Sequence, residues 1–239
     1  MHQTTKLFEE DAYRTQCEAT IVHINQQHGI ILDQTVFYPT GGGQPGDQGT
    51  LKVNGAEIKI ATTVYDRQTG ELIHVPASTD SMPNVGDKVE AEIDWSVRYL
   101  HMRMHTALHL LCSVVPCGVT GGQIGASKSR LDFDVGEHTL EKQQITDALN
   151  HLVEQPLAVT TEWVDDDILD QSPELVRTMS VKPPRGVGKV RLLRVGENVD
   201  LQPCGGTHVK STNEIGVIRV SKIENKGKRN RRVNIVFAD

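Results

Sequence analysis

The apolar pattern of this chain changes its period once, at residue 94, and that change limits what the chain can fold into. Up to residue 93, apolar and polar residues alternate in short runs separated by turn-forming residues, which is the pattern of β-strands. From Trp95 to about Val115, apolar residues recur every three or four positions, which is the pattern of a helix. The 239 residues suffice for two domains, and we predict them at residues 1–93 and 94–239.

The first part contains short alternating segments at residues 18–24, 29–33, 35–38, 49–53, 56–60 and 86–93. Asn54-Gly55 lies between two of them, and this pair is typical of a type I′ turn in a β-hairpin. Short strands at this spacing are typical of small barrels. We therefore predict a small β-barrel-like module.

The second part mixes helices and strands. Asp94 can cap the N-terminus of the long helix, and a second helix is predicted from Leu140 to about Val153. Strands are predicted at residues 131–134, 157–163, 189–193, 215–220 and 232–236. The predicted fold class is therefore α+β, with the barrel-like module followed by an α+β domain.

Two short motifs carry ligands that suit a metal ion. The long helix contains His105-Thr106-Ala107-Leu108-His109, and histidines four positions apart lie on one helical face, about 5–6 Å apart at Cβ. Far downstream, Cys204-Gly205-Gly206-Thr207-His208 holds a thiol and an imidazole around two glycines that let the segment fold back. Three imidazoles and a thiolate are typical zinc ligands, so we predict one Zn²⁺ per chain, bound by His105, His109, Cys204 and His208.

The same residue types have common roles that involve no metal. Cys204 could be a small buried thiol, and His208 a surface imidazole after a turn. His101 points about 80° away from His109 on the helix, so we interpret it as a neighbour of the site. Cys112 follows two leucines and is interpreted as a core thiol. The helix lacks the glutamate of the zinc-peptidase motif H-E-x-x-H, which disfavours peptide hydrolysis.

The net charge of −6 disfavours a nucleic-acid partner, but the distribution of charge does not. Residues 182–239 carry 13 Lys or Arg and 5 Asp or Glu, whereas the rest of the chain is acidic. Dense basic groups suit contacts with phosphates, although a solvated basic face would have the same composition. The two groups are Lys182, Arg185, Lys189, Arg191 and Arg194, and Lys226, Lys228, Arg229, Arg231 and Arg232.

A glycine-rich segment at residues 39–47 has no Lys-Ser or Lys-Thr ending, so it does not predict ATP binding. Strands are expected on both sides of it, and its chemistry alone indicates a wide β-turn. Four scattered cysteines, no long apolar stretch and a polar N-terminus predict a cytoplasmic protein without a membrane segment or a signal peptide.

The two metal motifs, in this order and at this separation, resemble the editing domain of alanyl-tRNA synthetases, which bacterial-type threonyl-tRNA synthetases share. Residues 37–47, Phe-Tyr-Pro-Thr-Gly-Gly-Gly-Gln-Pro-Gly-Asp, are similar to the glycine-rich motif that precedes this domain in the alanyl enzyme. The basic run at residues 226–232 is similar to one near the end of that family. Because the chain holds no synthetase core, it resembles the free-standing alanyl-tRNA editing proteins in their medium-length form, from about residue 8 to residue 236.

This resemblance implies a zinc-dependent hydrolase that removes serine or glycine from mischarged tRNA(Ala), with no obligatory protein partner. It implies that Gln123 corresponds to a functional glutamine. The threonine that the family has just before the second histidine is Leu108 here, and Thr106 lies near it. We therefore predict Gln123 and Thr106 as catalytic. The predicted substrate- and tRNA-binding residues are Gly41, Gly42, Gly43, Gln44, Lys226, Lys228, Arg229, Arg231 and Arg232.

Two functions of other classes remain open. Four ligands can form a closed structural site, so the chain could be an inactive RNA-binding module that zinc stabilises. A metal-dependent hydrolase of small esters or amides is disfavoured by the basic C-terminal part. A catalytic metal site keeps one position open for water or substrate. If this site is catalytic, we therefore expect Cys204 to be distant from the metal or displaced from it.

Overall fold

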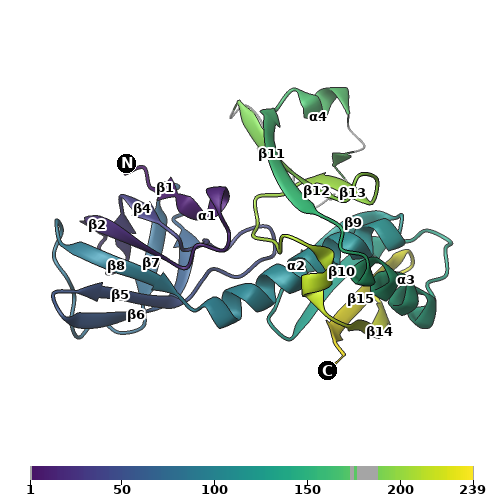
Figure 1. Ribbon diagram of the computed structural model, residues 1–239, viewed down its shortest axis with the longest axis horizontal. Helices are drawn as coiled ribbons and strands as arrows, with labels where there is room; N and C mark the ends of the chain where they lie inside the picture. The colour runs from purple at the N-terminus through teal and green to yellow at the C-terminus, as the bar shows by residue number, and fades with distance from the viewer. Residues whose placement is uncertain (1, 173–174, 177–187, 239) are drawn as a thin grey trace. The chain divides into compact units, whose positions relative to one another are not determined.

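The computed structural model describes residues 2–172, 175–176 and 188–238 (Figure 1). The chain divides into two compact units, Met1–Tyr99 and Leu100–Asp239. The division falls inside the longest helix, α2 (Trp95–Val114), a few residues after the change of period in the sequence. Across the described part of the chain, no helix combines the length and the apolar character that crossing a membrane requires.

The first unit contains a closed barrel, as the strand pattern predicts. Its strands follow the order β2 (Gln16–Ile24), β3 (Ile30–Leu32), β7 (Leu72–Pro76), β6 (Ala56–Tyr65), β5 (Gly49–Val53) and β8 (Lys88–Ile93), and β8 pairs with β2 to close it. Beside the barrel, β1 (Thr5–Lys6) pairs in parallel with β4 (Gln34–Thr35), and α1 (Leu7–Glu10) follows β1. The apolar side chains of alternate residues fill the barrel.

Local sequence explains most of this unit. Asn54 and Gly55 both have positive φ, as a type I′ turn between β5 and β6 requires. The predicted strand at 35–38 is wrong beyond Thr35, because the chain leaves the sheet there and enters the glycine-rich segment. Strand β7 was not predicted, since its three buried residues in succession do not alternate with polar ones.

A buried ion pair ties the glycine-rich segment to the start of α2. The guanidinium of Arg98 donates to the carboxylate of Asp47 and to the main-chain oxygens of Ala12 and Val36. Asp47 also accepts from the Tyr38 N–H at 2.6 Å. Asp94 accepts from the Val97 N–H at 3.3 Å and so caps α2 as predicted.

The second unit is α+β, as predicted. A four-stranded antiparallel sheet has the order β14 (Ile218–Asn225), β15 (Asn230–Phe237), β10 (Lys128–Asp134) and β9 (Gly118–Gln123). A second sheet has the order β11 (Val159–Asp165), β12 (Lys189–Val195) and β13 (Asp200–Pro203). The remaining elements are α3 (Lys142–Glu154), α4 (Ile168–Gln171) and the 3-10 helix η2 (Thr212–Ile215).

Two predictions for the second unit differ from the structure. The strand predicted at 215–220 begins only at Ile218, because Gly216 has a φ of +74° and ends η2 there. No strand was predicted at 118–123, where the glycines that follow α2 lie in β9, which pairs with β10 across a β-bulge.

Candidate metal centre

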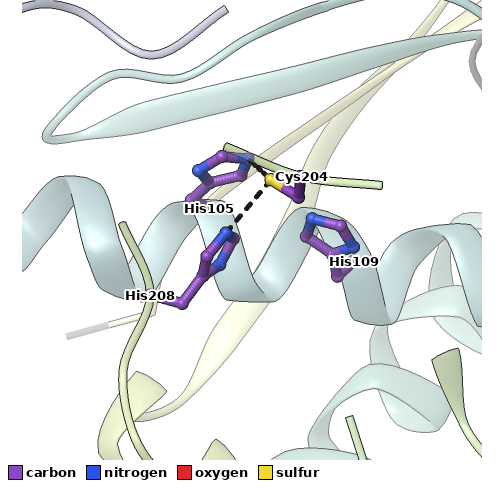
Figure 2. A group of neighbouring side chains, drawn as sticks. All are labelled: His105, His109, Cys204 and His208. Atoms are coloured by element: carbon purple, nitrogen blue, oxygen red, sulfur yellow. Dashed lines mark hydrogen bonds between the residues drawn. The ribbon is translucent and has the colours of Figure 1, made fainter. Parts of the chain in front are cut away.

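Helix α2 and the loop after β13 bring the four predicted ligands together. His105 and His109 lie one turn apart on α2, while Cys204 and His208 lie at the two ends of the loop (Figure 2). All four ligand atoms lie within 4.8 Å of one another. Cys204 Sγ is 3.5 Å from His105 Nε2 and 3.2 Å from His208 Nε2. This cluster can hold a metal ion.

The protonation states of Cys204 and His208 suit a metal. Burial raises the pKa of the Cys204 thiol, but the imidazoles of His105 and His208 outweigh it and hold that pKa well below its usual value. Burial, together with the neighbouring His105, lowers the pKa of His208 well below its usual value. A thiolate and a neutral imidazole are the forms that ligate metals.

The predicted ligand His109 has a further buried partner, the carboxylate of Asp200. Burial lowers the pKa of His109, but hydrogen bonds with Asp200 and Cys204 outweigh it and raise the pKa to about 10. Asp200 Oδ2 lies 2.7 Å from His109 Nδ1. No motif in the sequence points to Asp200, which follows the turn after β12.

Thr106 lies on α2 between the two histidines and is fully buried. Its hydroxyl oxygen lies 3.2 Å from His208 Nδ1 and accepts a hydrogen bond from the Val209 N–H at 3.3 Å. Gln123 is exposed at the end of β9, and its Oε1 accepts from Arg130 Nε at 3.3 Å. His101 and Cys112 are buried and do not belong to the four-residue group.

Arg191 does not belong to an exposed basic surface. Its side chain is buried, and Nη1 donates to the main-chain oxygens of Cys204 at 3.2 Å and of Gly206 at 2.7 Å. The interpretation of Arg191 as a phosphate contact is therefore wrong, because its guanidinium fastens the metal-binding loop to β12. Arg194 pairs with Glu162, Lys189 is exposed, and Lys182 and Arg185 lie outside the described residues.

The C-terminal basic run is partly neutralised. Arg232 donates to both carboxylate oxygens of Asp132 in β10, and Arg229 Nε donates to Asp134 at 3.0 Å. Arg231 Nη1 donates to the Gly227 oxygen and to Asn225. Lys226, Lys228 and Arg229 are exposed in the β14–β15 turn. The acidic partners in β10 are distant in sequence, so the run alone overstates the free positive charge.

The glycine-rich segment forms the expected turn within the first unit. Gly41 and Gln44 exchange main-chain hydrogen bonds, and Gly42 and Gly43 both have positive φ. Gln44 is fully buried. The predicted contacts of this turn with tRNA stay a prediction.

Gly46 in this segment gives a test of how tightly the turn is packed. A Cβ on Gly46 would lie 1.9 Å from the Thr63 oxygen, so we expect Gly46→Ala to cost about 2–3 kcal/mol of unfolding free energy. Gly42→Ala is the control, since no atom lies within 4 Å and only its φ of +56° costs about 1 kcal/mol. Urea unfolding measures both. Equal losses in the two variants would contradict the packing argument.

The sequence matches two family models. Residues 3–97 match class II (A) tRNA synthetases, and residues 190–234 match the second additional domain of threonyl- and alanyl-tRNA synthetases. The second match contains Cys204 and His208, which form the loop half of the cluster.

Curated relatives cover nearly the whole chain. It is 34% identical over 247 residues to the alanyl-tRNA editing protein AlaX-M of Methanosarcina barkeri, covering 99% of this chain and 100% of the relative. The AlaX-M protein of Pyrococcus horikoshii is 34% identical, with 98% of each chain covered. The alanine–tRNA ligase of Pyrobaculum neutrophilum is 34% identical over 93% of this chain, but over only 25% of its own length.

Proposed function

The chain belongs to the family of free-standing alanyl-tRNA editing proteins, and we propose that it hydrolyses the ester of tRNA(Ala) mischarged with serine or glycine. The observation that carries this proposal is the group formed by His105, His109, Cys204 and His208 in a chain that matches these relatives from end to end. Editing proteins act on tRNA(Ala); the choice of serine or glycine is our inference.

Zinc is the metal we assign to this group. Three imidazole nitrogens and one thiolate form a borderline-soft ligand set, and the low pKa of Cys204 keeps its sulfur ready to ligate. When bound, the ion supplies Lewis acidity, which polarises a carbonyl or lowers the pKa of water toward about 7. The residues of the chain hold and orient it.

The chemistry asked of the protein is modest. An aminoacyl ester is already activated, so its hydrolysis depends mainly on positioning and on stabilisation of the developing charge. Serine differs from alanine by one hydroxyl, and a synthetic site built for alanine rejects that addition poorly. A second site that hydrogen-bonds the hydroxyl would restore the discrimination.

A deacylation assay tests the function directly. We expect the purified protein to release serine from Ser-tRNA(Ala) much faster than it releases alanine from Ala-tRNA(Ala). A protein that binds zinc and tRNA without cleaving either ester would be an RNA-binding module. Equal cleavage of small amino-acid esters and of the charged tRNA would favour a general esterase.

Selectivity is expected to rest on Gln123. If Gln123 binds the seryl hydroxyl, Gln123→Ala slows Ser-tRNA(Ala) cleavage about 10- to 100-fold, which corresponds to about 1.5–3 kcal/mol of lost contact, and leaves Ala-tRNA(Ala) cleavage nearly unchanged. The ratio of the two rates is the measurement, because loss of metal or of fold would lower both together.

The roles of Gln123 and Thr106, the two predicted catalytic residues, can be distinguished by the effects of their variants on the two rates. Its hydroxyl contacts His208, so we propose that it acts through this ligand, and that Thr106→Val lowers both rates alike. A selective loss in Thr106→Val instead would make Thr106 the residue that reads the hydroxyl. Equal losses on both esters in Gln123→Ala would remove Gln123 from that role.

Exposed charges of the β14–β15 turn are expected to contact tRNA phosphates. Replacing Lys228 and Arg229 with Gln should weaken tRNA binding. It should also reduce the slope of the logarithm of the binding constant against the logarithm of the salt concentration by about one unit for each lost contact. Arg232→Gln should change the slope less, since Arg232 is half-buried and donates twice to Asp132, whereas Arg229 is largely exposed and makes a single bond to Asp134. Filter binding at several salt concentrations measures the slopes, and unchanged slopes in the double variant would show a merely solvated turn.

A further inference from the structure

A buried carboxylate stands behind one of the four clustered side chains. Asp200 Oδ2 lies 2.7 Å from His109 Nδ1, and the side chain of Asp200 is fully buried. Because the imidazole N–H at Nδ1 donates to this carboxylate, the other ring nitrogen, Nε2, is left as the atom that can ligate a metal. The contact therefore selects which nitrogen of His109 is available to a metal.

A second side chain fixes Asp200 in turn. Gln202 Nε2 donates to both carboxylate oxygens of Asp200, at 2.8 and 2.9 Å, and Gln202 is itself buried. These bonds keep Asp200 from rotating away from His109, and they compensate for the burial of its charge.

Strand geometry explains why these residues meet the metal cluster. Successive side chains of a strand point to opposite faces, so Asp200 and Gln202 share one face of β13. Cys204 follows two residues later, directly after the strand ends. The strand β13 and the residue after it thus place a carboxylate, an amide and a thiol on the same side of the chain.

We propose that Asp200, oriented by Gln202, is a positioning residue that presets His109 for the metal. A carboxylate that accepts from the outer nitrogen of a ligating imidazole fixes its tautomer and ring angle and makes it a better ligand. This inference rests on the metal assignment of the proposed function, but not on the identity of the tRNA or of the amino acid. Thr106 offers His208 only a neutral hydroxyl at 3.2 Å, so its contribution is smaller.

Zinc affinity is the primary test, measured on the full chain by competition with a chromophoric chelator in the absence of tRNA. We expect Asp200→Ala to weaken zinc binding about 10- to 100-fold. Asp200→Asn keeps an oxygen acceptor and should lose less, which would be partial rescue by the conservative variant. Gln202→Leu should fall between Asp200→Asn and the wild type.

Asn150→Ala is the matched control for general destabilisation. Asn150 hydrogen-bonds the main chain of Ile218 twice within the second unit, so its loss weakens the fold without touching the cluster. We expect this variant to bind zinc as tightly as the wild type. Unchanged affinity in Asp200→Ala, or equal losses in Asp200→Ala and Asn150→Ala, would overturn the proposal.

Nuclear magnetic resonance supplies a readout that a purely structural role would not move. In the zinc-loaded wild type, the ¹H–¹⁵N correlations of His109 should show a proton on Nδ1 and none on Nε2. In Asp200→Asn we expect His109 to populate a second tautomer or ring orientation. A wild-type protein that binds zinc through Nδ1 of His109 would contradict the inference, whereas loss of deacylation with zinc affinity intact would count against the proposed function alone.

Discussion

We expect His105→Ala to lower the rate of the proposed Ser-tRNA(Ala) deacylation by about three orders of magnitude and to abolish the proposed zinc binding. The ring nitrogen of His105 lies 3.5 Å from Cys204 Sγ, so its loss opens the cluster and leaves three ligands. The rate change follows from about 4 kcal/mol of lost charge stabilisation in the transition state. Elemental analysis should find about one zinc per wild-type chain and far less in the variant.

His101→Ala is the control for this prediction. His101 lies one turn before His105 on the same helix and is buried as well, but it does not belong to the group of four. This variant should keep about one zinc per chain, although burial makes some loss of stability expected. A metal-free wild type that is folded and active would remove the basis of the zinc assignment.

We expect Arg98→Ala to destabilise the first unit by about 3–5 kcal/mol, because it leaves the buried carboxylate of Asp47 without its cation. It also removes the donors of the Ala12 and Val36 main-chain oxygens. Hydrogen exchange of the β2 and β8 amides should show the loss, since these strands belong to the same unit.

Two further variants test whether the loss of stability comes from the unpaired charge of Asp47 or from the lost hydrogen bonds of Arg98. Arg98→Lys keeps the cation but loses the planar fork of donors, so its loss should be smaller. The combined change of Arg98 to Met and Asp47 to Leu removes both charges and should recover only part of the stability, because the Ala12 and Val36 oxygens and the Tyr38 N–H still lose these partners. A loss below about 1 kcal/mol in Arg98→Ala, the value typical of an exposed pair, would contradict the role given to this contact.

Predictions succeeded where a local signal carries the structure. The Asn54-Gly55 pair requires its turn, the spacing of apolar residues produces α2, and Asp94 caps that helix. His105 and His109 needed only the helical period to share a face. Their meeting with Cys204 and His208 followed from the chemistry of the ligands and from family resemblance, not from any local pattern.

The residues that were missed depend on contacts between distant segments. Nothing near Arg191 in the sequence shows that its guanidinium binds the oxygens of Cys204 and Gly206, so it was grouped with phosphate contacts. Asp200 and Gln202 lacked the apolar alternation by which strands were recognised. A usable signal did exist, since Asp200, Gln202 and Cys204 are polar or ligating residues at every second position.

The register in which β13 pairs with β12 limits the insertions and deletions that this protein can tolerate. Val195 pairs with Asp200 across the turn at 196–199, and this pairing decides which side chains point toward α2. A slip of one residue, about 3.3 Å, would exchange the faces and present Leu201 and Pro203 in place of the carboxylate and the amide. Deleting one turn residue is therefore expected to do more harm than changing its identity. Length at this turn, more than composition, should separate variants that keep the site from those that lose it.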